Sequence, residues 1–216
     1  MGDVCRYFIC LISLVAFVTL LEKLEGYKLL LGSQSPRRRQ LMEGAGFKFQ
    51  LLEPLDVDEI YPPHLKAEQI AVFLAELKAN AYQHYITDNK TILITADTIV
   101  WINEKVLGKP TDRNDALQML IELSNNEHFV YTGVCIKMKE KSKSFFAETK
   151  VKFRPLKQQE LEYYVDHYKP YDKAGSYGAQ EWIGYIGIKE IQGSYFNVMG
   201  LPIQMLYTEL EKLLIF

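Results

Sequence analysis

Apolar and polar residues alternate along this chain in two patterns, one typical of strands and one typical of helices. Short apolar or alternating runs predict strands, which we place at residues 27–31, 47–52, 91–96, 99–102, 128–138 and 145–153. Amphipathic stretches predict helices, which we place at residues 36–44, 66–85, 113–123, 158–168 and 202–214. The last two strands form a predicted hairpin. No linker separates these elements, and their order indicates a mixed α/β chain.

Local residue types set several of these boundaries. The run from Thr91 to Ala96 is continuously apolar or small, which predicts a strand buried on both faces. We expect this strand to end at Asp97, with residues 99–102 continuing towards a turn. Asp112 is a preferred N-cap residue, and we expect it to cap the helix that follows it. Residues 172–200 are rich in Gly and Tyr, and we expect a set of tight loops that wraps a ligand.

The N-terminus carries an uncharged apolar segment, Tyr7 to Leu21. It is shorter than the ~20 residues that span a bilayer and is closer in length to the core of an export signal. Its flanks supply neither the basic start nor the small-residue cleavage site of such a signal. We therefore favour a start that extends beyond the true domain, with a signal peptide or a weak membrane anchor as alternatives. On this interpretation residues 1–24 are an extension and residues 25–216 form one cytoplasmic domain.

Composition excludes several classes of protein. The 216 residues include 48% hydrophobic and 24% charged residues, which are ordinary values for a chain that buries its own core. A net charge of −2 argues against general nucleic-acid binding, which requires a basic surface. Cys5, Cys10 and Cys135 have neither metal-site spacing nor the density of a disulfide framework, which favours a reducing compartment. Any phosphate site must therefore be a local cluster.

The first strand leads into a polar turn that has the character of an anion site. The turn runs from Gly32 to Ser35, and Pro36 opens a helix, where its fixed φ and missing N–H cost nothing. Two serine hydroxyls and the guanidinium groups of Arg37, Arg38 and Arg39 meet unpaired amides at this helix N-terminus. Arginine adds forked donors that match phosphate oxygens. The pattern predicts a phosphate-binding corner, although a solvated, N-capped surface helix would show the same residues.

Two acidic residues are the first candidates for chemistry. A carboxylate such as Asp97, at the end of a doubly buried strand, is desolvated unless it faces a cleft, a metal or a cation. An Asp that caps its own turn is an equal alternative. Glu59 lies in an acidic loop, where a solvated charge is the simpler explanation. Together, however, two carboxylates can hold Mg²⁺ or Mn²⁺ against phosphate oxygens.

Two lysines extend this set. Lys109 lies between Gly108 and Pro110, where little conformational freedom suits a positioned cation, although such a sequence also occurs in ordinary turns. Lys78 lies at the edge of the apolar stripe of its helix, from which it can also reach solvent. With the arginines, these lysines would neutralise a polyphosphate and stabilise the charge that develops during its transfer. The set as a whole favours binding or hydrolysis of a nucleotide.

Eight short motifs follow one another along the chain: Ser33-x-Ser-Pro-Arg-Arg-Arg39, Asp58-Glu59, Leu77-Lys78-Ala79, Ala96-Asp-Thr98, Gly108-Lys-Pro110, Thr132-Gly-Val134, Asp172-Lys-Ala-Gly175 and Gly193-Ser-Tyr-Phe-Asn-Val-Met-Gly-Leu-Pro202. With these motifs the chain, from about Tyr27 to Leu214, resembles the Maf family of nucleotide pyrophosphatases. One motif would be weak, whereas eight in family order are highly specific. The resemblance implies an elongated α/β fold, similar to inosine triphosphatase, with a mixed, strongly bent sheet and flanking helices around a central nucleotide-binding cleft.

The resemblance also implies roles for individual residues. Asp97 corresponds to the general base that activates water, and with Glu59 it holds a divalent cation, Mg²⁺ or Mn²⁺. A set of polar and basic residues then binds the triphosphate: Ser33, Ser35, Arg38, Lys78, Lys109 and Lys173. The implied reaction is attack of water on the α-phosphorus of a nucleoside triphosphate, which releases a monophosphate and pyrophosphate.

Three positions separate branches of the family. The dTTP/UTP branch typically has Arg after S-x-S-P, Thr after the catalytic Asp, and Gln in a Tyr-Gly-x-Gln segment, and this chain has Arg37, Thr98 and Gln180. The branch similar to 7-methyl-GTP hydrolases tends to carry Trp, Gln and Glu instead. The Gln180 amide offers a donor and an acceptor that match the O4 and N3–H edge of thymine or uracil. Glu181 departs from the glycine that commonly follows this Gln, which would alter the base pocket.

The resemblance therefore implies a metal-dependent pyrophosphatase that acts on dTTP and UTP, without a nucleic-acid or membrane partner and with a homodimer left open. Alternatives are another pyrimidine triphosphate such as CTP, or a nucleotide-binding regulator of cell division without essential turnover. The water-activating carboxylate argues against the second alternative, since a pure binder does not need one. A membrane-associated scaffold has only residues 7–21 in its favour.

Overall fold

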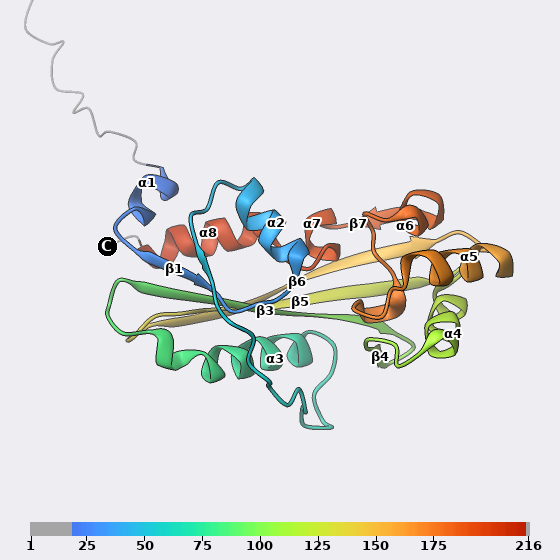
Figure 1. Cartoon of the computed structure of the whole chain (residues 1–216), viewed down its shortest axis with the longest axis horizontal. Helices are drawn as coiled ribbons and strands as arrows, with labels where there is room; N and C mark the ends of the chain where they lie inside the picture. Colours follow the sequence, from blue (N-terminus) through green and yellow to red (C-terminus); the bar gives the residue numbers. More distant parts are fainter. Residues whose placement is uncertain (1–18, 215–216) are drawn as a thin grey trace, which may run out of the picture.

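The structure is a computed structural model that describes residues 19–214, so most of the expected extension lies outside the described residues. Figure 1 shows an elongated molecule in which a long sheet runs lengthwise, with helices on both faces and a further group at one end. The prediction of an α/β fold with a mixed sheet is confirmed. Within residues 19–214, none of the helices has the length and apolar character needed to cross a membrane.

The described residues form one mixed sheet with the strand order β2–β1–β3–β5–β6–β7, and β4 pairs with part of β3. The strands are β1 (Lys28–Leu31), β2 (Gln50–Leu51), β3 (Thr91–Ile102), β4 (Lys105–Leu107), β5 (Glu127–Lys137), β6 (Ser142–Phe153) and β7 (Ile188–Gln192). Strand β1 is parallel to β2 and β3, whereas all other pairs are antiparallel. The three long strands β3, β5 and β6 extend along most of the molecule. The predicted hairpin is the β5–β6 pair.

Helices cover both faces of this sheet. The α-helices are α1 (Leu20–Leu24), α2 (Pro36–Gly44), α3 (Glu68–Ala81), α4 (Arg113–Leu123), α5 (Gln158–Tyr168), α6 (Trp182–Gly187), α7 (Tyr195–Val198) and α8 (Ile203–Leu214), and the 3₁₀ segments are η1 (Gln83–Tyr85) and η2 (Ala174–Ser176). Helix α3 lies on one face, α2 and α8 lie on the other, and α4, α5 and α6 gather at one end (Figure 1). Asp112 caps α4 as predicted, because its Oδ1 accepts a hydrogen bond from the Asp115 N–H at 2.9 Å.

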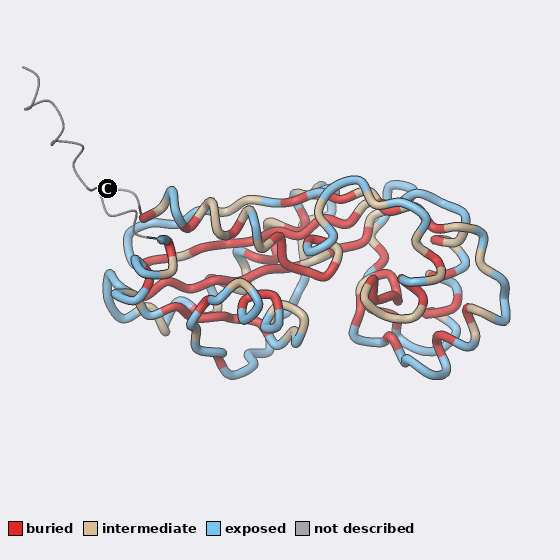
Figure 2. The backbone as a smooth tube through the Cα atoms, turned by 90° about the horizontal axis from the view of Figure 1, so that it is seen from above, coloured by how far each residue is buried: buried red, intermediate tan, exposed pale blue. Residues whose placement is uncertain are grey.

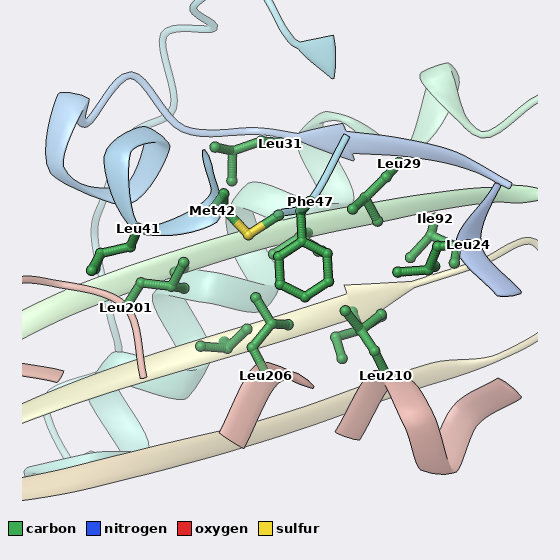
Figure 3. Close-up of a cluster of buried hydrophobic side chains, with 14 of the residues drawn as sticks. Leu24, Leu29, Leu31, Leu41, Met42, Phe47, Ile92, Leu201, Leu206 and Leu210 are labelled. Carbon is green, nitrogen blue, oxygen red and sulfur yellow. The ribbon is translucent and has the colours of Figure 1, made fainter. Parts of the chain in front are cut away.

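One core cluster lies between the sheet and helices α1, α2 and α8 (Figure 3). Helix α1 contributes Leu20 and Leu24, which are 1% and 8% exposed, and Thr19 caps this helix. Burial of a leucine side chain contributes roughly 1.5–3 kcal/mol to folding. Helix α1 therefore packs in this cluster although it lies before residue 25, the expected start of the domain.

A second core cluster joins the far end of the long strands to α4, α5 and α6. Its largest buried side chains include Phe153 from β6, Tyr164 from α5 and Leu120 from α4. Figure 2 shows buried segments along the strands and again within this end group. Helices α1, α2 and α8 and helices α4, α5 and α6 therefore form two groups on one shared sheet, and α3 packs on it in two further clusters.

Several predicted elements differ from the observed ones. Residues 172–200 are not loops alone, because they contain η2, α6, β7 and α7. These short elements are fixed by partners distant in sequence: β7, for example, pairs with the edge of β6. The helix expected over residues 66–85 ends at Ala81 and is followed by η1, and the strand expected over residues 47–52 is limited to Gln50–Leu51.

Candidate active site

Asp97 lies in the middle of β3, so the prediction that it ends a strand was wrong. The ladder continues past it because β5 pairs with β3 along nearly its whole length, with Asp97 opposite Gly133. On the other edge of β3, β1 pairs with residues 91–94 and β4 pairs with residues 100–102. No strand within residues 19–214 pairs with the intervening residues on that edge, which leaves the sheet open beside Asp97.

A cavity of about 690 Å³ lies at this opening. Its volume falls within the range of about 300–1,000 Å³ that is usual for small-molecule sites. All of the site residues predicted from the sequence line it: Ser33, Ser35, Arg37, Arg38, Glu59, Lys78, Asp97, Thr98, Lys109, Lys173 and Gln180. The fold therefore brings together residues from six segments of the chain that the sequence separates by up to 147 positions.

Lys78 links the two candidate acids. Its Nζ forms an ion pair with Glu59 Oε1 at 2.9 Å and donates a short hydrogen bond to Asp97 Oδ1. Helix α3 can lie this close to the sheet because Gly133 has no side chain: a Cβ there would be 2.2 Å from the Ala71 carbonyl oxygen. Glu59 comes from the segment before α3, which has neither helix nor strand around it.

The surroundings of Asp97 suit a general base. Its residue surface is only 7% exposed, and this burial raises the pKa of its carboxyl, while the charges of Lys78 and Arg38 act in the opposite direction. A raised pKa makes a carboxylate a stronger proton acceptor once it is ionised. The two nearby cations still allow it to ionise.

The chemistry of these acids fits a divalent cation held with substrate. Residues 19–214 contain no group of three or more His, Cys, Asp or Glu side chains that could hold a metal alone. Mg²⁺ is commonly bound by one or two carboxylates together with substrate phosphates and water. Asp97 and Glu59 already converge on one cation, the Lys78 ammonium. When bound, a metal would neutralise phosphate charge and increase the acidity of water.

Arg38 connects three parts of the site. Its Nε donates to the Gly200 carbonyl oxygen at 2.7 Å, Nη1 to Ser33 Oγ at 3.0 Å, and Nη2 to Thr98 Oγ1 at 3.0 Å. Burial lowers the pKa of Arg38, but a guanidinium starts so high that it stays charged. These bonds use one N–H on each terminal nitrogen, so one N–H on each remains for a phosphate oxygen.

The N-terminus of α2 lines the cavity at the corner where the sequence predicts phosphate binding. Ser35 is the N-cap residue, but its side chain makes no capping bond, and its N–H donates to Ser33 Oγ at 3.3 Å. Arg37 reaches across the cavity to Asp172, at 3.1 Å. Arg39 does not contribute, because it is exposed and pairs with Glu43 on its own helix. Two of the three arginines therefore face the cavity.

The remaining predicted residues differ in whether their side chains already have a partner in the protein. Lys109 is exposed on the loop between β4 and α4 and makes no ion pair within residues 19–214. Lys173 is buried and already paired with Asp172 at 2.7 Å and Glu181 at 3.0 Å. The Oε1 atom of Gln180 is buried without a hydrogen-bond partner in the described chain. Lys109 is therefore available to a ligand, whereas Lys173 is occupied.

Comparison with known proteins agrees with this geometry. A family model described as Maf-like protein matches residues 28–213. The chain belongs to this family. Curated relatives named dTTP/UTP pyrophosphatase include one from Bacteroides fragilis, 54% identical over 90% of this chain and 100% of the relative, and one from Phocaeicola vulgatus, 52% identical over the same shares. One from Porphyromonas gingivalis is 47% identical over 89% of this chain and 97% of the relative. The resemblance drawn from the eight motifs is confirmed.

Three further residues of this Maf-like site were not singled out from the sequence. Thr132 shares a hydrogen bond with Thr98 at 2.9 Å, and Asp172 orients Arg37. Both lie in the quoted motifs, so the motif itself could have pointed to them. Tyr82 bonds the backbone of Glu53 and Leu55 through its hydroxyl, at 3.1 and 3.2 Å. It anchors the start of the segment that carries Glu59, and no local pattern marks it.

Proposed function

We propose that the chain is a metal-dependent pyrophosphatase that converts dTTP and UTP to the nucleoside monophosphate and pyrophosphate. One observation carries the proposal: Asp97 and Glu59 converge on one cation beside an arginine-rich helix N-terminus, within a single cavity. The printed names of the relatives agree with it.

The described side chains divide the reaction between them. Asp97 accepts a proton from water as its oxygen bonds to the α-phosphorus, and the bond from that phosphorus to the bridging oxygen of pyrophosphate breaks. Arg38, the free amides of α2 and Lys109 would bind the negative oxygens of the triphosphate. Before substrate binds, the Lys78 ammonium compensates the negative charges of both carboxylates. A divalent cation on Asp97 and Glu59 would stabilise the charge on the phosphates.

Gln180 is the reason to propose a pyrimidine with a protonated N3. A buried acceptor without a partner costs free energy, about 1–3 kcal/mol, which a ligand donor recovers. The N3–H of thymine or uracil is such a donor. CTP remains the second candidate among substrates, because a reversed amide would match cytosine.

The domain division and the location form part of the same proposal. We place the start of the folded domain at or before Thr19, because Leu20 and Leu24 lie in the first core cluster. The residues before it are proposed to be dispensable for turnover, and the enzyme is proposed to act in the cytoplasm. Every residue of the candidate site lies after Gly32.

The test identifies the products and follows ¹⁸O from labelled water into them. Purified protein with Mg²⁺ or Mn²⁺ is expected to release pyrophosphate from UTP and dTTP, and EDTA should abolish this release. In ¹⁸O-water the label should enter the monophosphate, because water attacks the α-phosphorus. Orthophosphate as the first product, or label in pyrophosphate, would contradict the proposal. Tight binding without turnover would favour the regulator instead.

A further inference from the structure

One tyrosine hydroxyl holds both ends of the turn that carries Gln180. The Glu181 N–H donates to the Gly178 carbonyl oxygen at 3.0 Å, which closes the turn. Tyr164, buried on α5, accepts a hydrogen bond from the Gly178 N–H at 3.0 Å and donates a short one to Glu181 Oε2. Gln180 lies between these two ends. Its backbone position is therefore fixed by three hydrogen bonds that do not involve its own side chain.

The Glu181 side chain packs directly over this turn. A Cβ at Gly178 would lie 2.8 Å from Glu181 Cδ and 2.9 Å from its Oε2, so only glycine leaves room for the carboxylate. On the other side, a Cβ at Gly184 would lie 2.0 Å from the Ala179 carbonyl oxygen, so α6 also presses against the turn. The turn is confined on both sides.

The second oxygen of Glu181 binds Lys173. The distance from Lys173 Nζ to Glu181 Oε1 is 3.0 Å, and that to Asp172 Oδ1 is 2.7 Å. Asp172 in turn pairs with Arg37 at 3.1 Å. The Lys173 side chain is 8% exposed, so its charge is compensated within the protein by two carboxylates. A triphosphate would have to displace both of them to use this lysine.

We infer that Glu181 is a positioning residue for base recognition: it fixes the turn that presents the Gln180 amide, and Lys173 holds Glu181 in place rather than binding phosphate. The inference rests on the proposed function and deepens it by naming the substrate class. A turn held in one place keeps the Gln180 amide at one position in the cavity wall, where its Oε1, without a partner in residues 19–214, suits the N3–H of uracil and thymine. Cytosine has an acceptor at N3, so it would require the amide to reverse. A loosened turn would let the amide shift to suit either base, and the preference for uracil would fall.

The test compares UMP and CMP, whose bases differ only at the edge that Gln180 faces. Calorimetric dissociation constants for both are measured on wild type, Glu181→Gln and Tyr164→Phe, alongside kcat and KM for UTP and CTP. We expect the preference for UMP over CMP to fall about tenfold in both variants, the discrimination that a buried polar contact supplies. The kcat for UTP should change less than about threefold, since the reacting atoms are not touched.

Each variant has a matched control on α5. Glu162→Gln removes a half-buried carboxylate that accepts a hydrogen bond from Gln158 and makes no hydrogen bond to the turn. Tyr163→Phe removes a hydroxyl that has no hydrogen-bond partner within residues 19–214. Both controls should keep the wild-type preference. A preference unchanged in folded Glu181→Gln and Tyr164→Phe, or equal weakening of UMP and CMP, would overturn the inference, because a merely structural role moves both nucleotides together.

Lys173→Gln separates the two roles of the lysine. We expect it to lower the preference for UMP and to leave the affinity for pyrophosphate within about twofold of wild type. A tenfold loss of pyrophosphate affinity would show that Lys173 binds phosphate, and it would overturn this part of the inference. Wild type that prefers UMP but does not hydrolyse UTP would refute the proposed function alone, and the binding ratios would still decide the inference. Wild type that binds UMP and CMP equally would overturn the inference whatever the hydrolysis assay shows.

Discussion

Two clusters of identical composition lie at the same cavity, and each has a lysine between two carboxylates. In one, Lys78 joins Glu59 and Asp97, and in the other, Lys173 joins Asp172 and Glu181. The charges are equal, so composition does not distinguish them. What distinguishes them is how firmly each carboxylate is held by other groups.

In the Lys173 cluster both carboxylates have a second partner. Glu181 accepts from the Tyr164 hydroxyl, and Asp172 pairs with Arg37. In the Lys78 cluster, Glu59 lies on an irregular segment, its side chain is 43% exposed, and its only ion pair within residues 19–214 is with Lys78. Glu59 can therefore exchange its partner at small cost, whereas Glu181 cannot. On the proposed function, the Lys78 cluster is the one whose acids are free to take a new partner.

The largest expected effect comes from Asp97→Asn. The side chains are nearly equal in size, but an amide is neither a base nor an anionic metal ligand. Turnover of UTP should fall about 10²–10⁴-fold, and more if metal binding weakens. The affinity for UMP should change far less, since Gln180 is untouched. Steady-state kinetics, calorimetry and circular dichroism measure this, and near-normal turnover in a folded variant would return Asp97 to a structural role.

Next in size is the contrast between Lys78→Gln and Lys173→Gln. The first leaves Glu59 and Asp97 without their shared cation, and we expect turnover to fall about 10²-fold, the usual cost of losing one electrostatic contact at a reacting group. The second should lower turnover less than about threefold. Parallel kinetics on the two proteins give the ratio. Equal losses would show that the two clusters have the same role.

A smaller effect concerns stability and pH in metal-free protein. Burial raises the pKa of Asp97, so the folded protein holds this proton more tightly than the unfolded chain does. Ionisation therefore costs stability as the pH rises from about 4, the ordinary value, through the raised pKa. Asn does not ionise. The melting temperature of Asp97→Asn relative to wild type should rise across this window, and a difference constant with pH would refute the direction of the shift.

The smallest effect on both clusters is expected from shortening the chain. Neither cluster touches α1, so a chain that begins at Thr19 or at Glu25 should keep wild-type turnover per folded molecule. The second should melt about 5–15 °C lower than the first, because it lacks the buried Leu20 and Leu24. Calorimetry and active-site titration separate the two quantities. A loss of turnover in the chain from Thr19 would assign the preceding residues a role in the site.

Much of the fold could be predicted because strong local signals define it. Pro36 and Gly44 bound α2 as predicted, and α5 runs over Gln158–Tyr168 as predicted. The strand predicted from the sequence was shorter than β3, because a buried polar residue in mid-strand has the same local pattern as a strand end. The short elements after residue 172 depend on pairing with distant segments, which no local period reveals.

The candidate site was predictable to a similar extent. The motif resemblance named the residues that line the cavity, and the structure brings them together. Their roles stay predictions. The sequence could not show that Lys173 is occupied, because its partner Glu181 lies eight residues further along the chain and meets it only in the fold. Nor could it reveal Tyr164, which is one of several tyrosines on α5 and is distinguished only by its buried hydroxyl.

The opening in the edge of β3 has a consequence for specificity. Strands β3, β5 and β6 pass without a break beneath both groups of helices, so the two groups are packed on the same continuous strands. The remainder of the cavity wall includes residues of two segments outside these strands, 55–61 and 172–180. A change of sequence in either segment would alter the cavity wall while the strand that carries Asp97 keeps its place. New specificity can arise in this fold without rebuilding its chemistry.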